Sequence, residues 1–357
     1  MSVSDAFGVY IHIPFCSRRC DYCAFATWDD RGHLQTAYLK ALGAEVARTE
    51  MPLITSVFVG GGTPSLVSPD QLMNVVRMLP MTDDAEVTVE CNPDNVTAEL
   101  AHTYAAGGVT RISLGVQSMR ENVLQILGRA HNPANVRTAV EHIRAAGIKE
   151  VNLDLIYGSV GESVEDVRFT VEQVVGLDPN HVSAYGLTVE PGTPLSRDPS
   201  RFPDEDDEAD KYLVVDSLLE SAGYRNYEIS NWAKPGSECR HNILYWNQGN
   251  YFGFGCAAHS HLNGRRWWNV RTPDRYIDLV ASRESVEASS EVLDDAVRRT
   301  EAAQLALRMS SGVPRSSFSE NDLNALGDHV EITGDRVRLT PTGRLLANEI
   351  ALRLIVE

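Results

Sequence analysis

Short runs rich in β-branched residues alternate with segments of helical period through the first half of the chain. Six such runs recur, at positions 9–13, 57–60, 86–90, 111–116, 151–157 and 181–187. The clearest helix between them covers 133–146, with Asn132 as its N-cap and Gly147 just past its end. Six alternating units predict a parallel sheet with right-handed crossovers. Periodicity alone leaves open whether this sheet curls into a partial barrel or stays open.

Period-two alternation gives five of these strands one apolar and one polar face. The polar faces carry Tyr10 and His12; Thr88 and Glu90; Arg111, Ser113 and Gln117; Asn152 and Asp154; and Ser183 and Tyr185. In a parallel sheet that is buried on both faces, the strands instead have continuously apolar sequences. Since a buried polar group without a partner costs about 1–3 kcal/mol, such a lining needs water, mutual hydrogen bonds or a polar ligand. A barrel-like lumen that holds a charged cofactor is the reading we favour over a water-filled groove or a self-satisfied network.

The second half of the chain has a different pattern. An acidic run at 204–208 is expected on the first turn of a helix that reaches about Ala222. From about 291 the pattern is helical again, with a hairpin at 330–339 and a last helix that starts at Thr340 and Pro341. We therefore expect three parts: a partial-barrel domain at 1–235, a linking region at 236–289, and a small, mainly helical domain with a β-wing at 290–357.

Composition narrows the class of protein. The chain has 357 residues, 43% of them hydrophobic, and a formal net charge of −17. That charge argues against nucleic-acid binding, which needs clustered Lys and Arg. No apolar run reaches membrane-spanning length, and no targeting segment is visible. With free cysteines this predicts a cytoplasmic protein without an integral membrane segment, whose membrane contact would be peripheral and mediated by partners.

Cys16, Cys20 and Cys23 form a C-x3-C-x2-C cluster directly after the first predicted strand. Three thiolates on one loop can bind three irons of a [4Fe–4S] cube and leave the fourth iron open, whereas most electron-transfer clusters have four protein ligands. The alternative is a structural zinc site, but such sites want four ligands and usually two C-x-x-C knuckles. The other cysteines, Cys91, Cys239 and Cys256, stand singly.

A glycine run, Gly60-Gly61-Gly62-Thr63-Pro64, follows the second predicted strand. Consecutive glycines let a ligand approach the main chain, and the carboxyl ends of parallel strands are where active sites gather. A tight turn without a ligand is an equally good reading of this run alone. Beside an open-iron cluster, the run suits the amino group of S-adenosylmethionine.

Together these motifs resemble the radical S-adenosylmethionine superfamily, and within it the branch that contains oxygen-independent coproporphyrinogen oxidase and related haem chaperones. The matching segments span nearly the whole chain, at 10–16, 60–65, 90–93, 111–118, 152–158, 227–231 and 241–246. The resemblance implies a (β/α)6 partial TIM-like barrel in which the three clustered cysteines bind a [4Fe–4S] cluster. It also implies S-adenosylmethionine contacts from Tyr10, Tyr22, Gly61, Gly62, Thr63, Glu90, Gln117, Arg129 and Asp154.

The segment His241-Asn-Ile-Leu-Tyr245-Trp246 matches the H-N-x-x-Y-W signature associated with haem in the chaperones. The resemblance implies that His241 ligates haem iron and that Tyr245 and Trp246 face the porphyrin. His259 and His261 are weaker candidates for a second ligand, and Cys256 is expected to be a small buried hydrophobe. From chemistry alone, a lone histidine beside aromatic residues is more often structural.

Two features separate the oxidases from the chaperones. Phe25 stands where the oxidases carry a further cysteine, and few residues precede Val9, where the oxidases have an extension. Both favour a haem chaperone that transfers haem to haem-requiring acceptors such as respiratory enzymes, with a second copy of the chain as a further partner. A coproporphyrinogen oxidase that uses a 5′-deoxyadenosyl radical is the alternative. A cluster protein that modifies another small molecule is a third reading, so enzymatic activity is left open.

Overall fold

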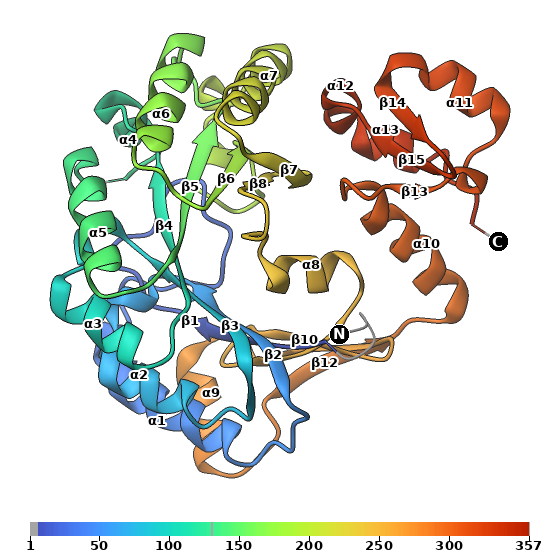
Figure 1. Cartoon of the computed structure of the whole chain (residues 1–357). Helices are drawn as coiled ribbons and strands as arrows, with labels where there is room; N and C mark the ends of the chain where they lie inside the picture. The colour runs from blue at the N-terminus through green and yellow to red at the C-terminus, as the bar shows by residue number, and fades with distance from the viewer. Residues whose placement is uncertain (1–5, 130, 357) are drawn as a thin grey trace.

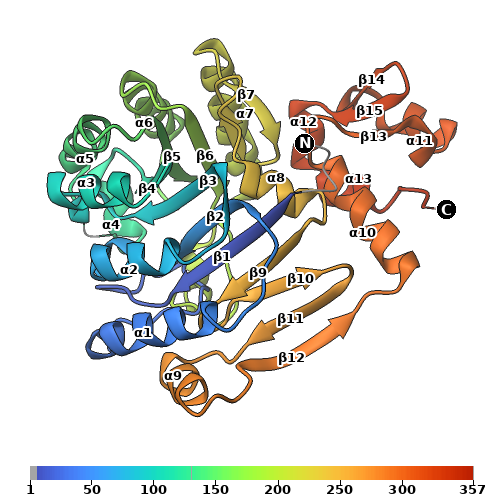
Figure 2. The same ribbon diagram turned by 60° about the horizontal axis from the view of Figure 1, so that its bottom comes forward.

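The centre of the protein is a large curved sheet, seen in the computed structural model, which describes residues 6–129 and 131–356 (Figures 1 and 2). Six parallel strands lie side by side in chain order within it. They are β1 (Phe7–Ile13), β2 (Ile54–Gly61), β3 (Met81–Cys91), β4 (Arg111–Gln117), β5 (Glu150–Tyr157) and β6 (His181–Gly186). All six were predicted from the alternation, and the fold is the α/β partial barrel that the resemblance implies.

Helices cover the outer, convex face of this sheet (Figure 1). They are α1 (Gln35–Val46), α2 (Pro69–Val76), α3 (Ala98–Ala106), α4 (Glu121–Ile126), α5 (Pro133–Ala145), α6 (Val164–Gly176) and α7 (Glu205–Ser221). The apolar strand faces lie beneath them: Val9, Ile11 and Ile13 of β1 are fully buried. The predicted helix at 133–146 is confirmed as α5, with the Asn132 side chain accepting from the Ala134 N–H as its cap. The acidic residues 205–208 occupy the first turn of α7, as predicted.

Further strands extend the sheet at both edges. β9 (Asn250–Phe254) pairs in parallel with β1, and β10 (His259–Leu262), β11 (Arg265–Asn269) and β12 (Glu287–Val292) follow it antiparallel. β8 (Asn231–Ala233) and β7 (Arg225–Glu228) continue beyond β6. Residues 236–289, predicted as a linking region, therefore form strands of the main sheet together with α8 (Arg240–Trp246) and α9 (Pro273–Ala281). The pattern missed these strands because they are short and lack the alternation of a two-faced strand: β9 and β11 are largely half-buried, and β12 is largely exposed.

The C-terminal part is a separate small unit with its own core. It contains α10 (Asp295–Leu307), β13 (Val313–Pro314), α11 (Glu320–Leu326), β14 (Val330–Thr333), β15 (Arg336–Leu339), α12 (Pro341–Leu345) and α13 (Ala347–Ala351). The predicted hairpin is the β14–β15 pair, and the predicted last helix begins at Pro341 as α12. Since β12 of the large sheet runs to Val292, the helical unit starts with α10.

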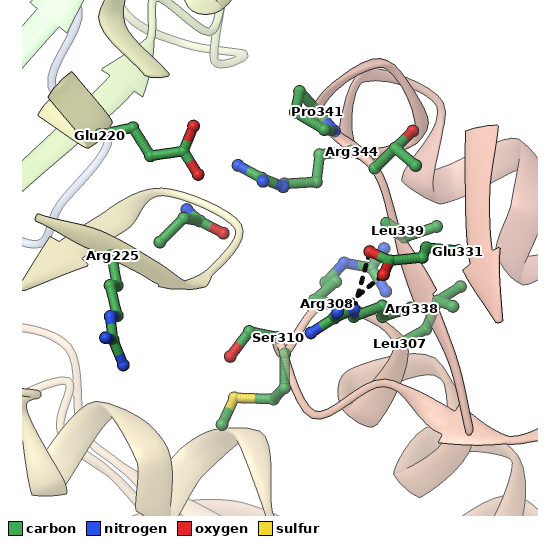
Figure 3. A pocket seen from close by; sticks show the side chains of 13 residues that line it. Glu220, Arg225, Leu307, Arg308, Ser310, Glu331, Arg338, Leu339, Pro341 and Arg344 are labelled. Atoms are coloured by element: carbon green, nitrogen blue, oxygen red, sulfur yellow. Dashed lines mark hydrogen bonds and ion pairs between the residues drawn. The ribbon is translucent and has the colours of Figure 1, made fainter. Parts of the chain in front are cut away.

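A cavity of about 280 Å³ lies where this unit meets α7 and β7 (Figure 3). Its wall includes four arginines, Arg225, Arg308, Arg338 and Arg344. It holds none of the cysteines and none of the residues that the sequence analysis selected, so the candidate site lies elsewhere.

Candidate cluster and nucleotide pocket

A larger cavity, of about 500 Å³, opens at the carboxyl ends of the parallel strands. It gathers residues from the cysteine loop, the glycine run and the ends of β3, β4 and β5. Eleven of the residues selected from the sequence line it: Cys16, Tyr22, Cys20, Cys23, Gly61, Gly62, Thr63, Glu90, Gln117, Arg129 and Asp154. Residues that are more than a hundred positions apart in the chain thus share one pocket.

The cysteine loop is anchored to the end of β1 by main-chain hydrogen bonds. Trp28 N–H donates to Pro14 O at 2.8 Å, and Cys16 N–H donates to Trp28 O at 3.0 Å. Donors also point at two sulfurs: the Thr63 hydroxyl lies 3.8 Å from Cys16 Sγ, and Arg129 Nη1 lies 3.5 Å from Cys20 Sγ. The Thr63 hydroxyl favours the thiolate form of Cys16, the form that binds metal.

The three thiols line the wall of the pocket without forming a closed metal site. Within 6–129 and 131–356, no three His, Cys, Asp or Glu side chains are already gathered around one point. Burial raises the pKa of the Cys16 and Cys23 thiols, so metal binding there has to displace protons. One loop with three sulfurs beside an open cavity fits a cluster with a free iron, because the cavity leaves room for an outside ligand.

The glycine run brings the end of β2 against its neighbours. A Cβ on Gly60 would lie 2.7 Å from Glu90 Oε2, and one on Gly62 would lie 2.6 Å from Phe15 O. Gly61 has a φ of +108°, which side chains rarely adopt. Its N–H donates to Glu90 Oε2 at 3.0 Å. The glycines are therefore required for the close approach of the strand to the cysteine loop and to the Glu90 carboxylate.

Two half-buried carboxyl groups, Glu90 and Asp154, line the pocket. Burial, with the charge of Asp154 as the second cause, raises the pKa of Glu90 from 4.5 to about 8. Burial also raises the pKa of Asp154, although Ser113 donates to its Oδ2 at 2.8 Å and Asn152 donates to its Oδ1 at 2.7 Å. Such a pair favours a cationic ligand, which stabilises both ionised carboxylates.

Arg129 and Gln117 complete the polar wall. Arg129 donates from Nη2 to Gly115 O at 2.9 Å, and its buried Nε has no partner in the described part of the chain. Gln117, at the end of β4, has a φ of +63°, a strained conformation that is common at functional sites. A guanidinium opposite two carboxylates matches a ligand that carries both a carboxylate and cationic groups, as S-adenosylmethionine does.

Tyr10 lies below the pocket, on the inner face of β1. Its hydroxyl is 3.0 Å from His12 Nδ1, and His12 Nε2 is 2.9 Å from Ala26 O in the cysteine loop. The Ala26 carbonyl can only accept, so Nε2 carries the proton and Nδ1 accepts from the tyrosine. Tyr10 is absent from the cavity wall and packs against Phe58 of β2 with ring centroids 6.4 Å apart.

The predicted haem residues lie at the opposite end of the strands. Helix α8 packs against β1 and β2, and His241 on it is fully buried. Its Nδ1 is 3.0 Å from Ser56 Oγ and its Nε2 is 2.8 Å from the Tyr245 hydroxyl. Burial lowers the pKa of His241 to about 4, so the ring is neutral. Tyr245 and Trp246 are half-buried. In this conformation both ring nitrogens are engaged, which the sequence motif did not predict.

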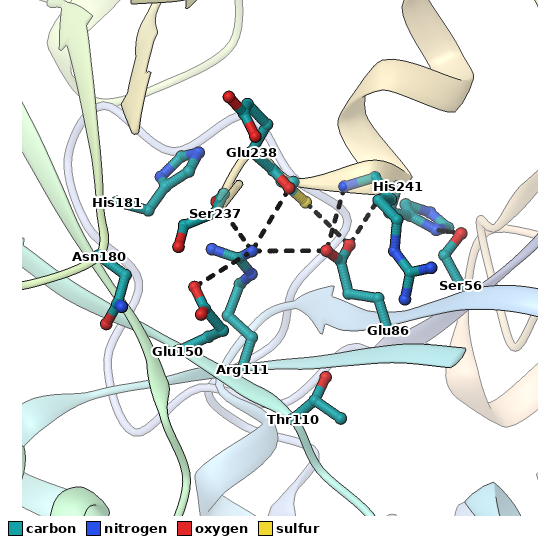
Figure 4. A network of polar contacts seen from close by, with 12 residues as sticks. Ser56, Glu86, Thr110, Arg111, Glu150, Asn180, His181, Ser237, Glu238 and His241 are labelled. Atoms are coloured by element: carbon teal, nitrogen blue, oxygen red, sulfur yellow. Dashed lines mark hydrogen bonds and ion pairs between the residues drawn. The ribbon is translucent and has the colours of Figure 1, made fainter. Parts of the chain in front are cut away.

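Glu86 and Arg111 hold the first turn of α8 (Figure 4). Glu86 accepts from the Arg240 and His241 N–H groups, at 3.1 Å each, and from Cys239 Sγ at 3.3 Å. Arg111 Nη2 lies 3.4 Å from Glu86 Oε2 and donates to Ser237 O at 3.0 Å. Glu86 comes from the buried part of β3, so nothing in its local sequence pointed to this contact.

The sequence analysis missed several pocket residues, among them Arg19, Tyr185 and Glu190. Tyr185 was available from the alternation of β6, since it lies on the polar face. Cys256 is buried, as expected, and its sulfur lies 3.6 Å from the Tyr38 hydroxyl. His261 is also buried, with Nδ1 2.9 Å from Gly249 O and Nε2 3.1 Å from the Gly264 N–H.

Residues 10–174 match the Radical SAM superfamily. A protein of Mycobacterium tuberculosis named Heme chaperone HemW is 40% identical over 98% of this chain and 95% of its own length. The chain belongs to the HemW family. The HemW of Escherichia coli is 37% identical over 98% of both chains, and that of Bacillus subtilis is 34% identical over 96% of this chain and 97% of its own.

Coproporphyrinogen III oxidase (HemN) from Escherichia coli, described as a radical SAM enzyme, has the same fold as this HemW-family chain. The two superpose with a TM-score of 0.84 over 98% of this chain and 90% of the oxidase. At 21% identity this likeness concerns the fold alone. Membership of the radical SAM superfamily implies a [4Fe–4S] cluster and S-adenosylmethionine, which the pocket described above fits in size, sulfur content and charge.

Proposed function

We propose that the protein is a haem chaperone that binds haem and transfers it to haem-requiring acceptors such as respiratory enzymes. One observation carries this proposal: relatives named Heme chaperone HemW match 96–98% of the chain at 34–40% identity. All six cysteines are free, which supports a reducing, cytoplasmic location. No helix within 6–129 and 131–356 is long and apolar enough to cross a membrane.

In this proposal Cys16, Cys20 and Cys23 would hold the [4Fe–4S] cluster, and S-adenosylmethionine would bind beside it in the same pocket. When bound, these groups supply one-electron and radical chemistry that side chains lack. The side chains of the pocket bind these groups and hold them in position. Arg129 pairs with the ligand carboxylate, while Glu90 and Asp154 accept hydrogen bonds from its ammonium or ribose hydroxyls.

Haem binding is proposed for α8, with His241 as the ligand of the iron. Tyr245 and Trp246 on the same helix offer aromatic surface to the porphyrin. Since Ser56 and Tyr245 occupy both ring nitrogens of His241, one of these bonds has to break before the imidazole reaches haem, by movement of α8 away from Ser56 or by rotation of the Tyr245 side chain. The neutral ring needs no deprotonation to act as a ligand, because burial keeps its pKa at about 4.

The experiment is an anaerobic haem titration of cluster-reconstituted protein, followed by visible absorbance. We expect saturable 1:1 binding that weakens at least about tenfold in His241→Ala, as loss of an iron ligand requires. His142→Ala is the matched control, because His142 is a half-buried histidine on α5 that bonds to Val96 O. Undiminished binding in His241→Ala overturns the ligand assignment, and no binding by the wild type overturns the function.

The alternative function expected from the sequence is oxygen-independent coproporphyrinogen oxidation. Phe25, at the position of the oxidases' further cysteine, lines the pocket with a 64% exposed side chain. An assay of coproporphyrinogen decarboxylation with reconstituted protein decides between them. Turnover would establish the rival, whereas haem uptake without turnover supports the chaperone.

A further inference from the structure

A continuous line of buried hydrogen bonds runs through the barrel from the nucleotide pocket to α8. Asn152 Nδ2 donates to Asp154 Oδ1 at 2.7 Å, and Asn152 Oδ1 lies 2.7 Å from His181 Nδ1. His181 Nε2 lies 2.8 Å from the Tyr227 hydroxyl, whose oxygen accepts from the Cys239 N–H at 3.3 Å. Cys239 is the N-cap of α8. The line thus joins a pocket carboxylate to the start of the helix that carries His241.

The two ends of this line fix the direction of every bond in it. A main-chain N–H can only donate, so the Tyr227 oxygen accepts from Cys239. At the other end Asn152 Nδ2 donates to Asp154, so Asn152 Oδ1 takes the proton of His181 Nδ1, and Nε2 of the neutral ring accepts from the Tyr227 hydroxyl. Burial and the charge of Arg111 lower the pKa of His181, consistent with one ring proton. All four bonds therefore point toward Asp154.

Two further N–H groups of the first turn of α8, those of Arg240 and His241, donate to Glu86 (Figure 4). The helix start is thus held by two acceptors, Tyr227 and Glu86. Only Tyr227 connects to the pocket through the line described above. This makes Tyr227 the point at which a change in the pocket can reach α8.

We propose that His181 and Tyr227 are positioning residues that couple nucleotide binding at Asp154 to the position of α8. This rests on the proposed function, which places S-adenosylmethionine against Asp154 and haem on His241. New donors from the ligand share the Asp154 carboxylate with Asn152 and weaken the Asn152 bond. Bonds in such a line polarise one another, so the hold on Cys239 weakens as well. Nucleotide binding therefore loosens the first turn of α8, one of the two movements that free the His241 ring.

The test is amide hydrogen exchange of the cluster-reconstituted full chain, without haem, in the absence and presence of S-adenosylmethionine. In the wild type we expect exchange in the peptide that covers 239–246 to become about fivefold faster or more when the nucleotide binds, the size of an ordinary coupling between sites. Tyr227→Phe keeps the ring but removes the hydroxyl. Its α8 exchange should be the same with and without nucleotide, while its nucleotide affinity stays within about twofold of the wild type.

Tyr224→Phe is the matched control, because the buried Tyr224 hydroxyl donates to Pro179 O at 2.7 Å and takes no part in the line. It should respond to nucleotide like the wild type. His181→Phe is a second break in the line, should Tyr227→Phe fold poorly. Unchanged or slower α8 exchange in the nucleotide-bound wild type overturns the coupling, and so does a full response in both line-breaking variants. Since no haem is added, these outcomes are independent of whether the protein binds haem.

Discussion

The protonation of Glu90 is the residue property with the clearest consequence for binding. Its pKa of about 8 means that the carboxyl is mostly neutral at pH 7 in the empty pocket. A ligand with an ammonium and a sulfonium favours the ionised form, so its binding releases a proton. Affinity for S-adenosylmethionine should therefore rise as the pH goes from 6 to 8 and level off above about 8, by up to about tenfold per pH unit on the steep part.

Glu90→Gln should lose most of this rise, with a weaker residual slope from Asp154, whose pKa burial also raises. The measurement is equilibrium binding of S-adenosylmethionine to cluster-reconstituted protein at several pH values. Glu190→Gln is the control, because Glu190 lines the same cavity but is exposed. The assignment of the pH dependence to Glu90 fails if Glu90→Gln keeps the wild-type pH profile of affinity.

Without ligand, the free energy of unfolding also falls as the pH rises from about 4.5 to 8. The reason is that Glu90 in the folded state holds a proton that the unfolded chain has lost.

At the scale of single residues, the sequence predicted those site residues that a local sequence pattern indicates. The family resemblance selected Glu90, Gln117 and Asp154, and strand periodicity independently assigns each of them to a polar face without knowledge of distant contacts. The surroundings of His241 could not be predicted from the sequence. Its partner Ser56 lies 185 positions away in the chain, and the closure of both ring nitrogens follows only from how α8 packs.

At the scale of elements, the placement of α8 depends on the buried pair Glu86–Arg111, whose side chains are 7% and 4% exposed. Arg111→Met keeps the length and apolar stem of the side chain but leaves the Glu86 carboxylate without its counter-charge. Removing one partner of a buried pair typically costs about 3–5 kcal/mol of unfolding free energy. We expect a loss near the lower end, because two main-chain N–H groups still donate to Glu86. Urea unfolding measures it.

Arg338→Met provides the comparison, since the Arg338–Glu331 pair is 43% and 54% exposed. Exposed pairs contribute about 0–1 kcal/mol. Adding Glu86→Gln to Arg111→Met should recover part of the loss, because it removes the uncompensated charge. Equal losses in the buried-pair and exposed-pair variants would show that Glu86–Arg111 does not anchor α8.

The elements themselves were predicted unevenly. β1–β6 and α5 followed from patterns that a few neighbouring residues create, namely alternation and an Asn-Pro helix start. β9–β12 were missed because tertiary pairing, rather than local pattern, makes them strands: β9 joins the sheet by pairing with β1, more than two hundred positions earlier. This pairing brings the segment that follows α8 back to the first strand of the sheet.

At the scale of the whole molecule, the nucleotide pocket and the haem motif lie at opposite ends of the same parallel strands. The barrel interior between them is partly the mutually satisfied polar network that we weighed against a ligand, formed by Ser113, Asn152, Ser183 and His181. The ligand pocket occupies only the carboxyl end. The self-satisfied network is therefore present in the depth of the barrel, and the open cavity at the carboxyl end is where a charged ligand is still predicted.

The small C-terminal unit has its own core, and it is joined to the large sheet by polar contacts that include the Arg266–Glu301 pair, the bond from Ser310 N–H to Tyr227 O, and Arg344. Arg344 Nη1 donates to Asp216 Oδ1 and to the Tyr212 hydroxyl on α7, at 2.8 and 2.9 Å, with the arginine side chain 13% exposed. Arg344→Met should leave the barrel folded but undock the unit more often, raising thermolysin cleavage around 293–313 at least about tenfold. Arg353→Met is the control, because Arg353 pairs with Asp322 inside the unit. Cleavage at the wild-type rate in Arg344→Met would mean that the other contacts, among them the Arg266–Glu301 pair, hold the unit in place without Arg344.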